Sequence, residues 1–149
     1  MNIIPPEDAV KRLVKEGSGD AQRFLVALQR RKPDLLVSAS RAFWQRVWHD
    51  DKTIVGEESL REVAQQAGID KTTLDQILVD IRSEEVRAQL KDNTQDAIDS
   101  GAYGAPWLVV SRKGHDDEAF FGSDRLWQVA DLLGFPYLDG LRKYATPKL

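Results

Sequence analysis

The stretch from residue 101 to residue 125 constrains the fold most, because it is the one part of the chain that departs from a helical pattern. The apolar run Trp107-Leu108-Val109-Val110 follows Gly104-Ala105-Pro106, which predicts a buried strand entered through a tight bend. Lys113-Gly114 predicts a turn, and Ala119-Phe120-Phe121 predicts a return strand. The stretch therefore predicts a two-stranded hairpin.

A helix follows this hairpin, and helical patterns also fill most of the chain before it. Gly122-Ser123-Asp124 opens the last helix, whose apolar residues recur at helical spacing: Leu126, Val129, Ala130 and Leu133. Upstream we expect six helices, which run from Pro5-Pro6-Glu7-Asp8 to Gly17, from Ser18 or Asp20 to Lys32, from Asp34 to His49, from Glu57 to Ala67, from Asp70 to Ile81 and from Ser83 to Gly101. The predicted fold class is mostly α (α+β), with about six helices before a ββα unit.

Two points in the hairpin region have the chemistry of a binding site. Pro106 cannot donate a hydrogen bond to a strand and can follow a cis peptide bond, which leaves the backbone around Ala105 free for an extended ligand. At Ser123 and Asp124, a helix start offers unpaired N–H groups to an anion, and the Asp124 carboxylate suits an ammonium group. Together they suit a zwitterionic, peptide-like ligand. The alternative is that Pro106 only shapes a turn and that Ser123 or Asp124 only caps a helix.

The third predicted helix is the most aromatic part of the chain. Trp44 and Trp48 lie one turn apart, which indicates either an aromatic wall for an apolar substrate or a helix that packs on more than one face. Arg41 and Arg46 on the same helix line a cleft in the first interpretation and are solvated in the second. The packing interpretation is the more common one for such a pattern.

Composition restricts the classes of function. The chain of 149 residues has no cysteine, which excludes a disulfide, a CxxC redox pair and a thiolate nucleophile of its own. Its two histidines, His49 and His115, argue against a metal site. A net charge of −3 does not indicate a basic surface that would bind nucleic acid. No apolar run is long enough to span a membrane, and the N-terminus lacks the pattern of a signal peptide. The last residues, Pro147-Lys148-Leu149, are a variant of the peroxisomal SKL signal.

Several separated motifs, in order, carry a resemblance to a known family. They are Gly17-Ser18 with Gln22-Arg23-Phe24-Leu25, Ser40-Arg41-Ala42-Phe43-Trp44 with Arg46-Val47-Trp48, Tyr103-Gly104-Ala105-Pro106, and Phe121-Gly122-Ser123-Asp124-Arg125 with Leu132-Leu133-Gly134. Over nearly all its length the chain resembles the kappa class of glutathione transferases, relatives of DsbA and of bacterial 2-hydroxychromene-2-carboxylate isomerases.

The resemblance implies a thioredoxin fold interrupted by a helical insertion, with residues 1–99 as the insertion and residues 100–149 as the closing ββα part of the thioredoxin-like domain. It implies that glutathione binds to the backbone of Ala105 before a cis Pro106, and that Ser123 and Asp124 hold its γ-glutamyl end. It also implies a small electrophilic substrate, no metal, a homodimer, and an intracellular location that is peroxisomal, mitochondrial or cytoplasmic.

The sequence also departs from the family pattern. In the family, a serine in the first βαβ unit stabilises the glutathione thiolate; we expect this sequence to begin after that unit, and we assign the role to none of its serines. The catalytic residue is therefore unknown. Ala105 stands where the family usually has a larger aliphatic residue. Because the expected contact with glutathione is made by the backbone, this difference in the side chain leaves it possible. Without the first unit, the strand at Trp107 has an open apolar edge.

Three functions follow from these observations. The first is a kappa-type glutathione transferase or related thioredoxin-fold oxidoreductase. The second is a non-catalytic relative that still binds glutathione. The third is an interaction module whose open strand edge recruits a partner by strand addition.

Overall fold

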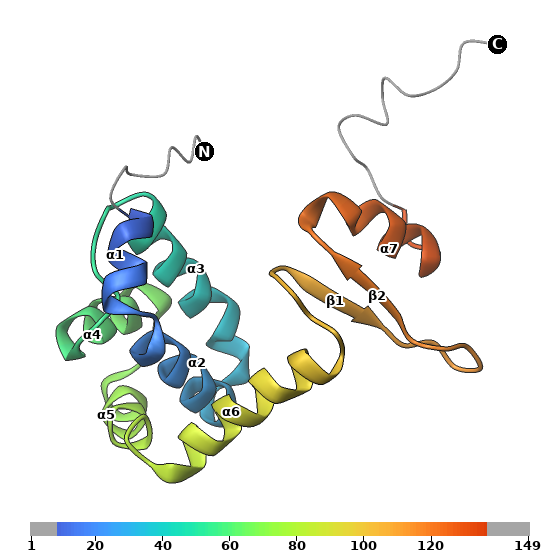
Figure 1. Ribbon diagram of the computed structural model, residues 1–149. Coiled ribbons are helices and arrows are strands. Elements are labelled where there is room, and N and C mark those ends of the chain that lie inside the picture. The colour runs from blue at the N-terminus through green and yellow to red at the C-terminus, as the bar shows by residue number, and fades with distance from the viewer. Residues whose placement is uncertain (1–8, 137–149) are drawn as a thin grey trace. The chain divides into compact units, whose positions relative to one another are not determined.

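The computed structural model describes residues 9–136, which divide into two compact units, one up to Asp92 and one from Asn93 onward (Figure 1). The helix start predicted at Pro5–Asp8 and the C-terminal Pro147-Lys148-Leu149 lie outside the described residues. No helix within residues 9–136 is long and apolar enough to cross a membrane.

The first unit is entirely helical. Its helices are α1 (Ala9–Glu16), α2 (Gly19–Arg31), α3 (Leu36–Trp48), α4 (Glu57–Ala67), α5 (Lys71–Asp80) and α6 (Glu84–Asp99), and α6 continues into the second unit. A short 3-10 turn, Pro33–Leu35, precedes α3, so α3 begins two residues later than the predicted Asp34. The mostly helical fold class is confirmed, and so is the helix of residues 57–67 at both ends.

Local sequence signals explain where these helices begin and end. Gly68 ends α4 in the left-handed backbone conformation, with φ 78°, which residues that carry a side chain rarely adopt. The Asp70 carboxylate accepts hydrogen bonds from the N–H of Thr73 at 2.9 Å and from its hydroxyl at 2.7 Å, and so caps α5. The Ser83 hydroxyl accepts from the Val86 N–H at 3.2 Å at the start of α6. Both predicted caps are confirmed.

The core of the first unit is built around α2. Phe24 and Leu28 of α2 are fully buried, and the Phe24 ring meets the edge of Phe43 on α3 with 5.6 Å between centroids. Leu60 and Val63 of α4, Ile77 of α5 and Val86 of α6 are also fully buried in the same cluster. The apolar stripes of α2, α4 and α5 are therefore the faces that these helices bury.

Arg46 on α3 is buried, with 8% exposure, which corrects the prediction of a solvated side chain. Its guanidinium donates to the Thr53 carbonyl at 2.5 Å and to Glu62 Oε2 at 2.5 Å, and lies 3.3 Å from the Ser59 hydroxyl. These partners belong to α4 and to the segment before it, so Arg46 joins that segment and α4 to α3. The hydrogen bond from Arg46, followed by its charge, lowers the pKa of the Glu62 carboxyl. Buried guanidinium groups require such partners.

The two tryptophans of α3 behave differently. Trp48 is half-buried against the core, as the packing interpretation predicts. Trp44 is 61% exposed in the described structure. Packing therefore accounts for Trp48 and leaves Trp44 outside the core of this unit.

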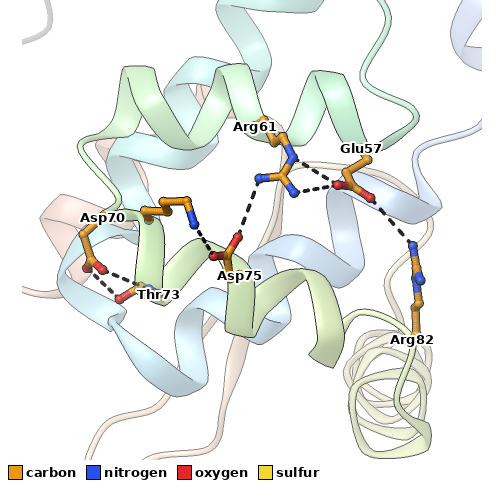
Figure 2. Close-up of polar contacts among 7 residues, drawn as sticks. Glu57, Arg61, Asp70, Thr73, Asp75 and Arg82 are labelled. Atoms are coloured by element: carbon orange, nitrogen blue, oxygen red, sulfur yellow. Dashed lines mark hydrogen bonds and ion pairs between the residues drawn. The ribbon is translucent and has the colours of Figure 1, made fainter.

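A chain of ion pairs connects α4 and α5 at their surface (Figure 2). The Arg61 guanidinium of α4 donates to Glu57 at 2.6 Å and lies 3.6 Å from Asp75 of α5, which also accepts from Lys71 at 3.0 Å. Lys71, followed by Arg61, lowers the pKa of the Asp75 carboxyl. These exposed pairs contribute little individually, since solvent screens them.

The second unit contains an antiparallel hairpin and one helix. Strands β1 (Trp107–Val110) and β2 (Glu118–Phe121) pair with Trp107 opposite Phe121 and Val110 opposite Glu118. A 3-10 turn, Ser123–Arg125, leads into α7 (Leu126–Leu132). The Arg112 guanidinium, beyond β1, pairs with Glu118 at 2.7 Å, which fastens the hairpin near its tip.

Burial in this unit is lower than the apolar patterns predict. Val110 is buried, whereas Val109 is 44% exposed. Leu126 of α7 is 40% exposed, and Leu133, which follows α7, is 39% exposed. A two-stranded sheet and a helix of seven residues have too little surface to enclose a core by themselves, which is why the prediction of a buried strand is wrong for all of β1 except Val110.

We predict that Arg46→Met destabilises the first unit by about 1–3 kcal/mol, because the Thr53 carbonyl and the Ser59 hydroxyl lose their partner. Urea unfolding followed by circular dichroism measures the change. Arg41→Met, on the exposed face of the same helix, is the matched control and should leave the midpoint unchanged. Equal stability of the two variants would contradict a structural role for Arg46.

We predict that the Asp70 cap makes the stability of the first unit decrease as the pH is lowered. The Thr73 hydroxyl and N–H lower the pKa of the Asp70 carboxyl, so its contribution is present above the unfolded pKa of about 4 and is lost as the pH falls through the folded value. Asp70→Asn keeps an acceptor for the Thr73 N–H but cannot titrate. Its melting temperature should therefore fall less than that of the wild type between about pH 5 and pH 3.

The control is Asp92→Asn, which removes an exposed carboxylate of α6. Asp92 has no ion pair or side-chain hydrogen bond among residues 9–136. This variant should keep the wild-type pH dependence, and an Asp70→Asn curve that follows the wild type would disprove the role of the cap.

Candidate functional site

The two predicted site segments are joined by one backbone hydrogen bond. The Ala105–Pro106 peptide bond is cis and leads directly into β1. The Gly122 N–H, which follows β2, donates to the Pro106 carbonyl at 3.0 Å. Residues 105–106 and 122–124, which are far apart in the sequence, are therefore neighbours at one end of the hairpin, next to the Trp107–Phe121 pair.

The backbone of Ala105 is unoccupied within this arrangement. Among residues 9–136, neither its N–H nor its carbonyl has a hydrogen-bond partner, and the residue is exposed. Ala105 lies in a bend just before β1, and its free donor and acceptor groups can pair with the backbone of a peptide-like ligand.

Gly122 sets the direction in which the chain enters residues 123–125, the second of the two site segments. Its φ of 95° and ψ of 148° lie in a region that other residues adopt only with strain, and an added Cβ would collide with Asp124 Oδ1. The chain turns there from β2 into the Ser123–Arg125 turn. The N–H groups of Ser123 and Asp124 consequently have no acceptor in the described part of the chain.

The side chains of Ser123 and Asp124 are exposed beside these N–H groups. Gly122 occupies the N-cap position and has no side chain, and neither Ser123 nor Asp124 makes a capping hydrogen bond within residues 9–136. Asp124 Oδ2 lies 3.5 Å from Arg125 Nε, and 76% of the Asp124 side chain is accessible. The segment therefore presents N–H donors, a hydroxyl and a carboxylate close together, as a zwitterion requires.

An aromatic cluster lies beside the site and was missed by the sequence patterns. The Tyr103 ring contacts Phe121 at 4.8 Å and Trp107 at 5.3 Å between centroids. Gly104 follows Tyr103, and an added Cβ there would lie 2.6 Å from the Phe121 ring. Tyr103 lies in a loop, outside any periodic element, so only the aromatic residues at the start of the first predicted strand and the end of the second could have indicated it.

One cavity of the first unit is bordered by charged groups that already pair with each other. A cavity of about 410 Å³ in the first unit is bordered by Arg31 and Asp80. Arg31 already donates to both Asp80 oxygens and to Gln76, and the Asp80 carboxylate raises its pKa. Within residues 9–136, no group of three or more His, Asp or Glu side chains has the geometry to hold a metal ion. The hairpin end is therefore the candidate site.

Comparison with known proteins identifies the family of this fold. Residues 6–134 match the family described as DSBA-like thioredoxin domain. The chain is 35% identical over 129 residues to glutathione S-transferase kappa 1 of Homo sapiens, covering 87% of this chain and 57% of that protein. It is 31% identical over 134 residues to glutathione S-transferase kappa 1 of Caenorhabditis elegans, covering 90% of this chain and 58% of that protein.

A further relative in Caenorhabditis elegans, glutathione s-transferase kappa 2, is 34% identical over 140 residues, which cover 93% of this chain and 61% of that protein. The chain belongs to the DsbA-like thioredoxin family, and the resemblance to its kappa-class glutathione transferases is confirmed. It spans about three-fifths of the length of the curated relatives it matches.

We predict that Gly122→Ala disrupts the site, because alanine at φ 95° is strained and its Cβ would push the Asp124 carboxylate out of its present place. The variant should unfold about 1–3 kcal/mol more easily in the second unit or lose the Gly122–Pro106 hydrogen bond. Amide exchange measured by NMR would show faster exchange at residue 122. Gly114→Ala, at the hairpin tip with φ 82° and open space around it, is the matched control for backbone strain alone. Faster exchange at residue 122 in both variants would contradict a specific role for Gly122.

Proposed function

We propose that this chain functions as a kappa-type glutathione transferase, which joins the thiolate of glutathione to a small electrophile. The observation that supports this most is the Gly122–Pro106 hydrogen bond, which brings the free backbone of Ala105 beside the donors and the carboxylate of Ser123 and Asp124. The kappa-class relatives carry the names of enzymes of this kind. In this proposal residues 1–99 form the helical insertion and residues 100–149 the closing part of the thioredoxin-like domain.

Each end of glutathione has a complementary group in this arrangement. The peptide backbone of glutathione pairs with the N–H and carbonyl of Ala105 at the entrance to β1. The γ-glutamyl carboxylate accepts from the N–H groups of Ser123 and Asp124 and from the Ser123 hydroxyl. The γ-glutamyl ammonium pairs with the Asp124 carboxylate, which exchanges its contact with Arg125 for a charge-assisted hydrogen bond.

The chemistry of the reaction follows from the thiolate. Loss of the thiol proton makes glutathione a nucleophile, its sulfur forms a bond to the electrophilic carbon, and a leaving group departs or a proton is taken up. The residues of this chain supply binding and orientation, which raise the rate by holding the sulfur close to the electrophile. We assign the stabilisation of the thiolate to no residue of this sequence.

The proposal includes an assembly and a location. The kappa-class resemblance supports a homodimer. The C-terminal Pro147-Lys148-Leu149 supports import into peroxisomes, with mitochondria and the cytoplasm as the other locations that the resemblance implies. Microscopy of a fluorescent protein fused before the intact C-terminus, compared with one in which the last three residues are removed, distinguishes the peroxisomal address from the others.

Titration with glutathione tests the proposal directly. Isothermal calorimetry on the wild type should give saturable binding, and Asp124→Asn should weaken it by roughly ten-fold, because the ammonium loses an ionic partner while the shape of the side chain is kept. Asp131→Asn on α7 removes the same charge from the same unit and should leave the affinity unchanged.

Two results would contradict the proposal. Wild-type affinity in Asp124→Asn would remove Asp124 from the site. Absence of binding to a folded wild-type protein would reject glutathione as its ligand. Where binding is present, conjugation of glutathione to an electrophile, followed by the loss of free thiol, separates a transferase from a protein that only binds glutathione.

A further inference from the structure

The loop that carries Ala105 has few contacts to hold it. It connects the end of α6 to β1, and at its first end Gly101 and Ala102 donate to Ile98 and Ala97 carbonyls at 2.9 and 3.0 Å. At its other end the Pro106 carbonyl accepts from Gly122 at 3.0 Å. Between these ends, no backbone hydrogen bond within residues 9–136 fixes residues 103–105.

Side chains fix the loop instead. The Tyr103 ring lies against both Trp107 on β1 and Phe121 on β2, which form the terminal pair of the hairpin. Gly104 leaves room for the Phe121 ring, since an added Cβ would lie only 2.6 Å from it. The loop therefore rests directly on the last ring of β2.

Trp107 is itself held from the other side. Its indole Nε1 donates to the Ser100 hydroxyl at 3.0 Å, and that hydroxyl donates to the Ala97 carbonyl at 2.7 Å. Trp107 is thus attached to the end of α6, and Tyr103 packs on a fixed ring. Tyr103 is 75% exposed, so its ring contacts bury little apolar surface. Their main effect is to fix the place of the Tyr103 ring against Trp107 and Phe121.

We propose that Tyr103 is a positioning residue, whose ring holds the loop so that the free Ala105 backbone faces the Ser123–Asp124 turn. The proposal rests on the function proposed above for the use of that backbone, but the position of the loop is a property that is measured without any ligand. Tyr103 acts through Ala105 and is not a catalytic residue. The ring is what matters, and the hydroxyl is dispensable.

Amide exchange measured by NMR on the full chain tests this. The Gly122 N–H reports whether the loop is in place, since its acceptor is the Pro106 carbonyl. In Tyr103→Ala this amide should exchange roughly three- to ten-fold faster, which corresponds to the loss of one or two ring contacts, while the amides of the β1–β2 ladder keep their rates. Tyr103→Phe should restore the wild-type rate.

A second aromatic residue provides the matched control. Phe135 is also exposed in this unit and makes no ring contact within residues 9–136. Phe135→Ala should leave the Gly122 amide unchanged. An unchanged rate in Tyr103→Ala, or equal acceleration in Tyr103→Ala and Tyr103→Phe, would overturn the positioning role.

Calorimetry with glutathione on the same variants separates this proposal from the proposed function. If the wild type binds, Tyr103→Ala should bind roughly three- to ten-fold more weakly and Tyr103→Phe normally; equal affinity of all three would overturn the link to the site. If the wild type does not bind glutathione, the proposed function fails, and the exchange of the Gly122 amide alone decides whether Tyr103 positions the loop.

Discussion

The hydrogen bond from the Gly122 N–H to the Pro106 carbonyl is the contact on which the candidate site depends. It closes the hairpin beyond its last residue pair and brings a cis-proline loop beside the turn that contains Asp124. The bond requires the chain to reverse at φ 95°, which glycine adopts without strain. In a unit with little buried apolar surface, backbone hydrogen bonds and ring contacts supply the order that a core supplies elsewhere.

The first unit, in contrast, is held together by a buried apolar core. Phe24, Leu28, Leu60 and Ile77 are almost fully enclosed, and Arg46 is buried among partners from α4 and the preceding segment. Such a unit gains its stability from apolar burial and satisfied polar groups. This difference in burial between the two units matters for function. A binding site needs hydrogen-bond donors that the protein's own acceptors do not already use, and the hairpin end leaves Ala105, Ser123 and Asp124 accessible.

The family match and the geometry of the hairpin end are independent observations. The DsbA-like match covers residues 6–134, and the kappa-class relatives are 31–35% identical. The physical arrangement, independently, offers a free backbone N–H and carbonyl at Ala105 and, beside them, N–H donors with a carboxylate at Ser123 and Asp124. A short peptide with a free amino-acid end has the complementary groups, and glutathione is such a peptide. In the positioning role proposed for Tyr103, its contacts with Trp107 and Phe121 keep the backbone part of the site in place.

The sequence by itself determined the helices, their ends and the ββα order, because caps such as Asp70 and Ser83 and the glycine at residue 68 act through neighbours within a few residues. It also indicated Ala105–Pro106 and Ser123–Asp124 as the candidate site. Only the tertiary structure decided which distant groups meet. Arg46 is buried because folding brings Thr53 and Glu62 to it, and Tyr103 contacts Phe121 because the hairpin closes. Such contacts have no sequence period, so they arise only once the chain has folded.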